Sequence, residues 1–353
     1  MNLDNYAAFT QIDTQNMLAQ IDGLPDQLQA AWQSGLQNPL PVWQGIERVV
    51  LAGMGGSAIG ADLLSAYIAP ACPVPVVVHR NYGLPAWARG PHTLAICISH
   101  SGNTEESLSA FEVASEAEMR CLAIATGGAL AEAAEKAGVP LWKFEHHGQP
   151  RAAVGFSFGL LLAALTRLGL IPDPSQEVST AVAAMRSQQV HLAAQSPATQ
   201  NLAKRLAGQL IGRWITVFGS DLLAPVARRW KGQINELAKT WAQFDLLPEA
   251  DHNSLAGTLN PEDLLDRSMA LFLSASSDHP RNRLRAELTR KALMLEGINT
   301  DSVNAIGENP LAQQWTCLHL GDYVAYYLAM AYEVDPTPIS VIADFKDAMK
   351  SGG

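Results

Sequence analysis

Positive charge is scarce in this sequence. The 353 residues include 24 lysines and arginines against 34 aspartates and glutamates, which gives a net charge of −10. Nucleic acids are bound through clustered Lys and Arg side chains, so we do not expect this acidic chain, which has no basic stripe, to bind them. A small phosphorylated ligand is still allowed, because it needs only a local positive field.

Cysteine is scarce as well. The four cysteines are dispersed, no pair has the spacing of metal ligands, and the nine histidines form no metal-type triad. We therefore predict no metal and no other cofactor. Cys97 and Cys121 fall in apolar runs, which predicts buried, reduced thiols in a cytoplasmic protein. Residues 1–11 lack the basic cluster and apolar core of a signal peptide, which fits the same location.

One apolar stretch is long enough to be compared with a membrane span. It covers residues 152–171, but Arg167 interrupts it near its end, and Ser157 and Thr166 dilute it. A buried helix that coats a parallel sheet has the same composition. We predict such a core helix and no membrane contact.

Two motifs rich in small residues are the most informative feature of the chain. Each is an apolar run that ends in glycines and hydroxyls and then enters a helical pattern: VVLAGMGGSAIG at residues 49–60 and ICISHSGNTEE at residues 96–106. Such loops place hydroxyls and free amides at the carboxyl end of a strand, where a phosphate can bind. The hydroxyl set consists of Ser57, Ser99, Ser101 and Thr104.

Known phosphate and nucleophile motifs do not fit these loops. The third glycine of the first loop falls one position late for a dinucleotide fingerprint, and no Gly-Lys-Ser or Gly-Lys-Thr is present. No serine lies in a Gly-x-Ser-x-Gly elbow, which argues against a serine hydrolase. A tight turn with a helix N-cap explains one such loop alone, whereas two loops on neighbouring strands favour an anion site.

Strand and helix patterns alternate along the chain, which is typical of a doubly wound parallel α/β sheet. Strand-like runs occupy residues 49–52, 74–79, 93–99, 120–126 and 140–144, and a second series occupies residues 214–219, 269–276 and 300–303. The polar stretch 172–197 is the candidate boundary between two domains. We predict a helical lead-in at 1–40, domains at 41–172 and 198–334, and a C-terminal segment at 335–353.

Three charged residues are candidates for chemistry, although each also has an ordinary structural explanation. Arg151 precedes the apolar helix, and its ordinary explanation is a surface charge at a helix start. A cation there opposes the helix dipole, which makes a role toward a ligand somewhat more attractive. Glu236 lies on a helical pattern whose buried stripe is predicted to consist of Trp230, Ile234, Leu237 and Trp241, with Arg229 and Gln233 beside Glu236 on another face. Its ordinary explanation is a solvated carboxylate paired with Lys239. His252 lies in a polar loop, where a histidine is often incidental.

Taken together and in order, five motifs resemble the bifunctional phosphoglucose/phosphomannose isomerases of the sugar isomerase (SIS) superfamily. They are MGGSAIG at 54–60, SHSGNTEE at 99–106, PRA at 150–152, QINE at 233–236 and DHN at 251–253. The resemblance runs from about residue 45 to the DPTP motif at 335–338. It implies two tandem SIS domains, each a doubly wound parallel sheet flanked by helices, and a homodimer with active sites near the subunit interface.

The resemblance also implies roles for single residues. Gly55, Gly56 and Ser57 would line the sugar-phosphate site, while Ser99, Ser101 and Thr104 would hold the phosphate. Glu236 matches the base, Arg151 the residue that stabilises the enediolate, and His252 the ring-opening residue, supplied by the partner subunit. Lys346 matches the family's C-terminal active-site lysine, with Lys350 as a competing choice. The family pattern leaves His100, between two phosphate serines, unexplained.

The leading hypothesis is therefore a metal-independent isomerase that interconverts glucose 6-phosphate or mannose 6-phosphate with fructose 6-phosphate through a cis-enediol. A SIS isomerase of an amino-sugar or pentose phosphate is the alternative among enzymes. A regulator that binds a sugar phosphate without catalysis is the alternative from another class. The regulator leaves Arg151, Glu236 and His252 unexplained as a set.

Overall fold

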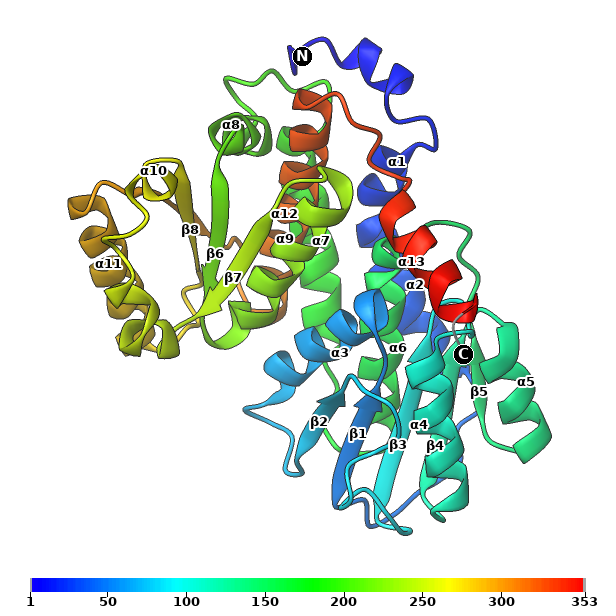
Figure 1. Cartoon of the computed structure of the whole chain (residues 1–353). Helices are drawn as coiled ribbons and strands as arrows, with labels where there is room; N and C mark the ends of the chain where they lie inside the picture. Colours follow the sequence, from blue (N-terminus) through cyan, green and yellow to red (C-terminus); the bar gives the residue numbers. More distant parts are fainter. Residues whose placement is uncertain (1, 352–353) are drawn as a thin grey trace.

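The computed structural model describes residues 2–351, and two separate parallel sheets form its frame (Figure 1). The first sheet has the strand order β2-β1-β3-β4-β5, with β1 (Arg48–Ala52), β2 (Val76–His79), β3 (Thr93–Ser99), β4 (Arg120–Ala125) and β5 (Leu141–Lys143). All seven residues of β3 are buried. Parallel strands with helices on both faces read as continuous apolar runs, which is why the sequence pattern located these strands correctly.

The second sheet has the order β7-β6-β8-β9, with β6 (Trp214–Gly219), β7 (Ala242–Leu246), β8 (Ser268–Ser274) and β9 (Asn299–Asn304). The three strands expected from the sequence are present. No strand was expected at β7. This strand lies at the edge of the sheet and only its first residue is buried, so it lacks the apolar run that marks a central strand.

Helices flank both sheets and fill the space between them. Those of the first half are α3 (Gly55–Ile68), α4 (Glu105–Glu116), α5 (Gly128–Ala137) and α6 (Val154–Arg167). Those of the second half are α8 (Leu202–Leu210), α9 (Ala224–Leu237), α10 (Glu262–Leu265), α11 (Pro280–Leu295) and α12 (Pro310–Ala331). Figure 1 shows α3, α6, α9 and α12 in the region between the sheets. The apolar stretch 152–171 contains α6, which is a buried core helix as expected.

The central helix is α12, which is buried along almost its whole length. A helix with apolar side chains on every side would expose apolar surface to water unless other elements cover it all round. α12 therefore requires neighbours on every side. Gln314 on α12 donates from its amide to the Leu63 carbonyl at 3.1 Å and to the Leu222 carbonyl at 3.2 Å. These bonds tie α12 to α3 and to the short η3 turn (Asp221–Leu223).

Close packing between α9 and α12 depends on one glycine. A Cβ atom at Gly321 would lie 2.1 Å from the indole nitrogen of Trp230. That nitrogen donates to the Cys317 carbonyl at 2.9 Å, so the ring cannot move away without losing a buried hydrogen bond. The glycine therefore lets α9 approach the central helix.

The stripe predicted for α9 needs two corrections. Trp230, Ile234 and Leu237 are buried as expected, but Trp241 lies beyond the end of the helix and is 61% exposed. Arg229 was expected beside Glu236 on a face away from the buried stripe, yet it is only 4% exposed. The first error arises because the helix ends at Leu237, before Trp241. The second arises because helical periodicity assigns faces without showing which distant elements cover them.

The stretch 172–197 is largely helical. It contains α7 (Ser175–Leu192), which packs on α2 (Leu24–Gln37) and on α12. The predicted domains at 41–172 and 198–334 each enclose one sheet, and their limits stay a prediction. Residues 2–40 form η1 (Tyr6–Gln11), α1 (Met17–Asp22) and α2, and the chain ends in α13 (Ser340–Ser351). Within residues 2–351 no helix has the length and apolarity that crossing a bilayer requires.

A buried carboxyl in the second half makes stability depend on pH. Asp278 is 3% exposed and accepts a hydrogen bond from the Ala275 amide at 2.7 Å, while its other oxygen has no partner among the described residues. Burial raises its pKa to about 6, against the backbone hydrogen bond, which lowers it. Between about pH 4 and pH 6 the unfolded chain loses this proton while the folded protein keeps it.

We therefore expect stability to fall as the pH rises through this range, by at most about 3 kcal/mol from this group. Asp278→Asn removes the charge and should raise the melting temperature at pH 8 by several degrees, with little change at pH 4. Thermal unfolding at both pH values checks this, with the exposed Asp263→Asn as a control. An unchanged or lower melting temperature at pH 8 would contradict the expectation.

Candidate active site

The two glycine- and hydroxyl-rich motifs meet at one edge of the first sheet. β1 and β3 are hydrogen-bonded neighbours, with Ala52 opposite Cys97, and each strand is followed by the N-terminus of a helix. α3 begins at Gly55 and α4 begins at Glu105. Two helices of 14 and 12 residues thus present free amides and the positive ends of their dipoles at the same edge.

The predicted hydroxyls lie within these loops. Ser99 Oγ and Thr104 Oγ1 are 2.9 Å apart, and Ser101 Oγ accepts a hydrogen bond from the Asn103 amide at 3.2 Å. Ser57 and Ser99 are buried, whereas Ser101 is exposed. The loop after β3 therefore has neutral donors and no cation of its own.

His100, which the motif comparison left open, is explained by packing. Its Nε2 lies 3.0 Å from Nδ1 of His146, and its ring meets those of Phe144 and His146 edge to face. Burial, together with His146, lowers the pKa of His100 to about 4. The imidazole is therefore neutral near pH 7 and supplies no positive charge to an anion in the adjacent loop.

Arg151 is held in the short η2 turn (Pro150–Ala152) and is only 5% exposed. Its Nη2 donates to the carbonyls of Pro336 at 2.9 Å and Thr337 at 2.5 Å. Its Nη1 lies 3.6 Å from Oε2 of Glu236. Burial lowers the pKa of Arg151 and the charge of Glu236 opposes that change, so the guanidinium stays charged.

Glu236 lies near the end of α9 and its side chain is 35% exposed, so the carboxylate is accessible from solvent. Earlier on the same helix, Arg229 donates from Nη1 to the Arg151 carbonyl at 2.7 Å. It also forms a two-point pair with Asp322, through Nε at 3.1 Å and Nη2 at 2.9 Å. The second half of the chain therefore fixes both members of the Arg151–Glu236 pair.

A cavity of about 410 Å³ lies between the two halves and contains this pair. Of the residues predicted from the sequence, it brings together Gly55, Gly56, Arg151 and Glu236. Five cationic side chains line it, namely Arg80, Arg151, Arg228, Arg229 and Lys231. An acidic protein therefore carries a locally positive cavity, which suits an anionic ligand.

Sequence reasoning missed four of those cations. Arg80 follows the carboxyl end of β2, and its position at the edge where ligands bind was a usable signal. Arg228, Arg229 and Lys231 form a basic run on α9 that was available in the sequence. Asp62 pairs with Arg80 and, at 2.9 Å, with Arg228, so part of the positive charge is balanced inside the cavity.

Other predicted residues lie elsewhere. His252 is exposed at the end of η4 (Glu249–His252), and Lys346 is exposed on α13. Neither lines the cavity in the single chain. Lys350 pairs with Asp347 on α13 at 3.2 Å. The roles of His252 and Lys346 stay predictions, and within residues 2–351 no group of three ligating side chains is placed to hold a metal ion.

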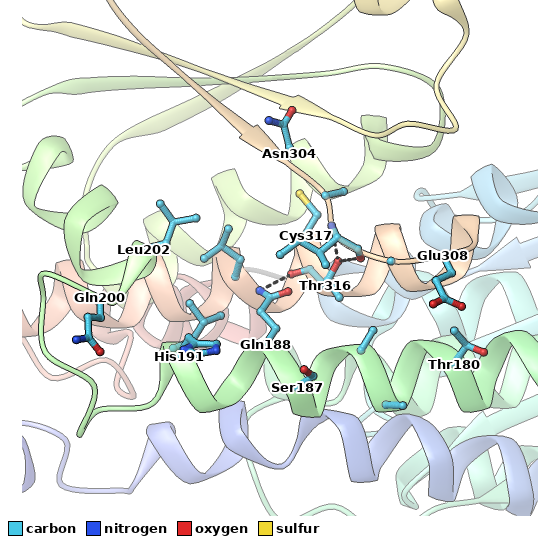
Figure 2. A pocket seen from close by; sticks show the side chains of 17 residues that line it. Thr180, Ser187, Gln188, His191, Gln200, Leu202, Asn304, Glu308, Thr316 and Cys317 are labelled. Carbon is cyan, nitrogen blue, oxygen red and sulfur yellow. Dashed lines mark hydrogen bonds between the residues drawn. The ribbon is translucent and has the colours of Figure 1, made fainter.

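A larger cavity of about 670 Å³ lies between α7 and α12 and the segment after β9. Figure 2 shows its polar side chains spread along the walls, with the Gln188 amide donating to the Thr316 carbonyl at 3.2 Å. It is lined by alanines and leucines with His191 and Glu308, and its lining includes no Lys or Arg. Because it offers no counter-charge for a phosphate, we assign the ligand site to the smaller cavity.

Comparison with known proteins agrees with this geometry. Residues 199–349 match the model of the bacterial phospho-glucose isomerase C-terminal SIS domain. A bifunctional phosphoglucose/phosphomannose isomerase from Caldicellulosiruptor bescii is 37% identical over 94% of this chain and 98% of its own length. One from Aquifex aeolicus is 33% identical over 86% of this chain and 90% of its own length. The chain belongs to the bifunctional phosphoglucose/phosphomannose isomerase family.

Solved structures give the same fold for this family member. A hypothetical protein from Thermus thermophilus superposes with a TM-score of 0.74, at 18% identity, over 99% of this chain and 93% of its own. The predicted α/β fold with two parallel sheets flanked by helices is therefore confirmed. Three of the five motifs that carried the resemblance contribute lining residues to the cavity, namely those at 54–60, 150–152 and 233–236. The motifs at 99–106 and 251–253 contribute none, and Ser57 does not line the cavity either.

The position of Arg151 in the cavity depends on the absence of a side chain at Gly56. A Cβ atom at Gly56 would lie 2.5 Å from the Pro150 carbonyl oxygen and 3.3 Å from the Arg151 Cα atom. Because these neighbours are backbone atoms, η2 must shift and carry Arg151 with it. We expect Gly56→Ala to lower kcat/KM about 100-fold, measured with sugar phosphates, since misplacement by about 1 Å has an effect of that size.

Gly208→Ala on α8 is the matched control for this prediction, because the added Cβ would have no described heavy atom within 4 Å beyond its own surroundings on the helix. It should keep the kcat/KM of the wild type. A fully active Gly56→Ala enzyme would show that the contact with η2 does not position Arg151.

Proposed function

We propose that this protein is a metal-independent aldose–ketose isomerase that interconverts glucose 6-phosphate or mannose 6-phosphate with fructose 6-phosphate. The observation that supports it best is the 3.6 Å pair of Arg151 and Glu236 in a cavity that is also lined by the N-terminus of α3. A carboxylate, a cation and an anion-binding helix end are what this chemistry requires.

In the proposed complex, the phosphate lies at the loop edge of the first sheet. The amides at the start of α3 and the hydroxyls of Ser57, Ser99, Ser101 and Thr104 bind it, through neutral donors and helix dipoles. The sugar then extends toward Arg151 and Glu236. His252, supplied by the partner subunit, opens the ring by moving a proton between the ring oxygen and the anomeric hydroxyl.

Glu236 then removes the proton from C2 of the open aldose. The electron pair of that bond forms the C1–C2 double bond, and the C1 carbonyl becomes an oxyanion that takes up a proton. The charged guanidinium of Arg151 stabilises this oxyanion while it develops. Return of the carboxyl proton to C1, with loss of the proton from the C2 hydroxyl, gives the ketose. Lys346 would complete the site from the C-terminal helix.

The enzyme is further proposed to be a homodimer of the cytoplasm. An exposed His252 outside the cavity supports the dimer, because the proposed role needs this residue at the site of another copy. Four cysteines without a disulfide fit a reducing compartment.

A substrate panel separates the alternatives. Glucose 6-phosphate and mannose 6-phosphate should both give fructose 6-phosphate, whereas amino-sugar and pentose phosphates should react far more slowly. Turnover of neither hexose phosphate would overturn the proposal. Binding of a hexose phosphate without turnover would favour the regulator.

Replacing the base tests the mechanism directly. Glu236→Gln keeps the size of the side chain but cannot accept the C2 proton, so we expect kcat to fall about 1,000-fold. Binding of fructose 6-phosphate, measured by calorimetry, should persist. Exposed Glu112→Gln on α4 is the matched control. Wild-type kcat in Glu236→Gln would exclude this residue as the base.

Mixing two inactive variants tests the shared site. If His252 acts on the partner's cavity, a dimer of one Glu236→Gln and one His252→Asn subunit contains one intact site and one doubly impaired site. Random exchange of equal amounts should therefore restore about a quarter of the wild-type activity. Recovery that stays at the level of the separate variants would place His252 in the site of its own chain.

A further inference from the structure

One lysine beside the reacting pair has no role in the proposed mechanism. Lys239 lies two residues beyond the end of α9, where the chain turns toward β7. Its backbone φ angle is +53°, in the left-handed region that residues other than glycine rarely adopt. Such a conformation persists only where the surroundings hold it, and these positions concentrate at functional sites.

The Lys239 ammonium joins the catalytic helix to the C-terminal segment. Its Nζ donates to the main-chain carbonyl of Glu236 at 2.6 Å and to the Pro336 carbonyl at 3.5 Å. Arg151 donates to the same Pro336 carbonyl at 2.9 Å. Two cations from different parts of the chain therefore converge on one carbonyl oxygen next to the catalytic carboxylate.

The residues on either side of Pro336 have contacts of their own. Asp335 accepts hydrogen bonds from the Thr337 amide at 2.9 Å and from the Thr14 hydroxyl at 2.7 Å. Thr337 is 1% exposed, so its carbonyl reaches Arg151 from a buried position. These contacts anchor Asp335 and Thr337, while the Pro336 carbonyl between them accepts from Arg151 and Lys239.

This arrangement determines how Arg151 meets Glu236. Nη2 of Arg151 is occupied by the carbonyls of Pro336 and Thr337, which leaves Nη1 alone facing the carboxylate at 3.6 Å. If the segment moved away, both nitrogens could close on Glu236 in a two-point ion pair, the strongest geometry for these groups. A carboxylate in such a pair is a poorer base for the sugar proton.

The charged groups around Lys239 come from three elements: Arg151 in η2, Glu236 in α9, and Asp335 in the segment after α12. Burial and, next, Arg151 lower the pKa of Lys239 to about 8, while Asp335 and Glu236 oppose that change. The ammonium is therefore the group of this cluster that loses its charge just above neutral pH.

We propose that Lys239 is a positioning residue of the isomerase, which holds the 335–337 segment on Arg151, keeps Glu236 free to act as a base, and sets the alkaline limit of turnover. This inference rests on the function proposed above. Lys239 touches no reacting atom, so it acts through Arg151 and Glu236.

The test compares pH profiles of kcat for the wild type, Lys239→Arg and Lys239→Met between pH 6 and about pH 10. The wild type should lose turnover above about pH 8. Lys239→Arg keeps a charge that does not titrate in this range, so its turnover should stay high to about pH 10. Lys239→Met should show kcat lowered about 10-fold or more at neutral pH, with KM within about threefold and no alkaline decline of its own.

A control variant and two further measurements distinguish a positioning role of Lys239 from a general loss of structure. Lys291→Met on α11 removes an exposed lysine and should match the wild type at every pH. Thermal unfolding reports whether Lys239→Met is folded, and if it is not, the profile of Lys239→Arg decides. A crystal structure of Lys239→Met should show both Arg151 nitrogens on Glu236.

Wild-type kcat in Lys239→Met, or an alkaline decline unchanged in Lys239→Arg, would overturn the inference. A loss of kcat equal in both variants would also overturn it, because it would show a structural role alone. The absence of hexose phosphate turnover in the wild type is a separate result, which rejects the proposed function before any variant is compared.

Discussion

The buried ion pair between Arg229 and Asp322 is the interaction on which the site depends. Both side chains are 4% exposed, and their two hydrogen bonds, at 3.1 and 2.9 Å, join α9 to the central helix α12. The remaining arm of Arg229 binds the Arg151 carbonyl at 2.7 Å. Removing one partner of such a pair leaves an uncompensated buried charge, at a cost of about 3–5 kcal/mol. One guanidinium therefore fixes α9, which carries Glu236, and η2, which carries Arg151, together.

The central helix gives this pair a rigid base. α12 contacts α7, α8 and α9, and Gln314 reaches the carbonyls of Leu63 and Leu222, one from each half of the chain. Neither sheet alone could set the distance between Arg151 and Glu236, because one residue follows the first sheet and the other lies on a helix of the second. The distance between Arg151 and Glu236 is set where both halves of the chain pack on α12. A polar site therefore depends on a largely apolar helix.

The parts of the molecule that could be predicted are those whose structure follows from a short local stretch of sequence. The motifs after β1 and β3 were recognisable because glycines and hydroxyls at the end of an apolar run have a direct physical meaning. β7 was missed because only its first residue is buried, so its sequence contains no apolar run. The burial of Arg229 and the contact of Lys239 with the Pro336 carbonyl could not be predicted, because both depend on segments that are about 90 residues or more away in the chain. Periodicity shows which residues share a face, but not which distant element covers it.

The distribution of charge in the cavity follows from the reaction that it is proposed to serve. A phosphate held by neutral hydroxyls and helix amides is bound equally in substrate and transition state, which anchors the sugar without changing the barrier. Arg151 lies instead beside Glu236, at the end of the proposed site where negative charge develops only during proton transfer. Holding Arg151 with two main-chain carbonyls keeps that cation close to the carboxylate without neutralising it. The neutral donors and the restrained cation thus have different tasks in the proposed reaction: the donors hold the sugar phosphate, and Arg151 stabilises the charge that develops.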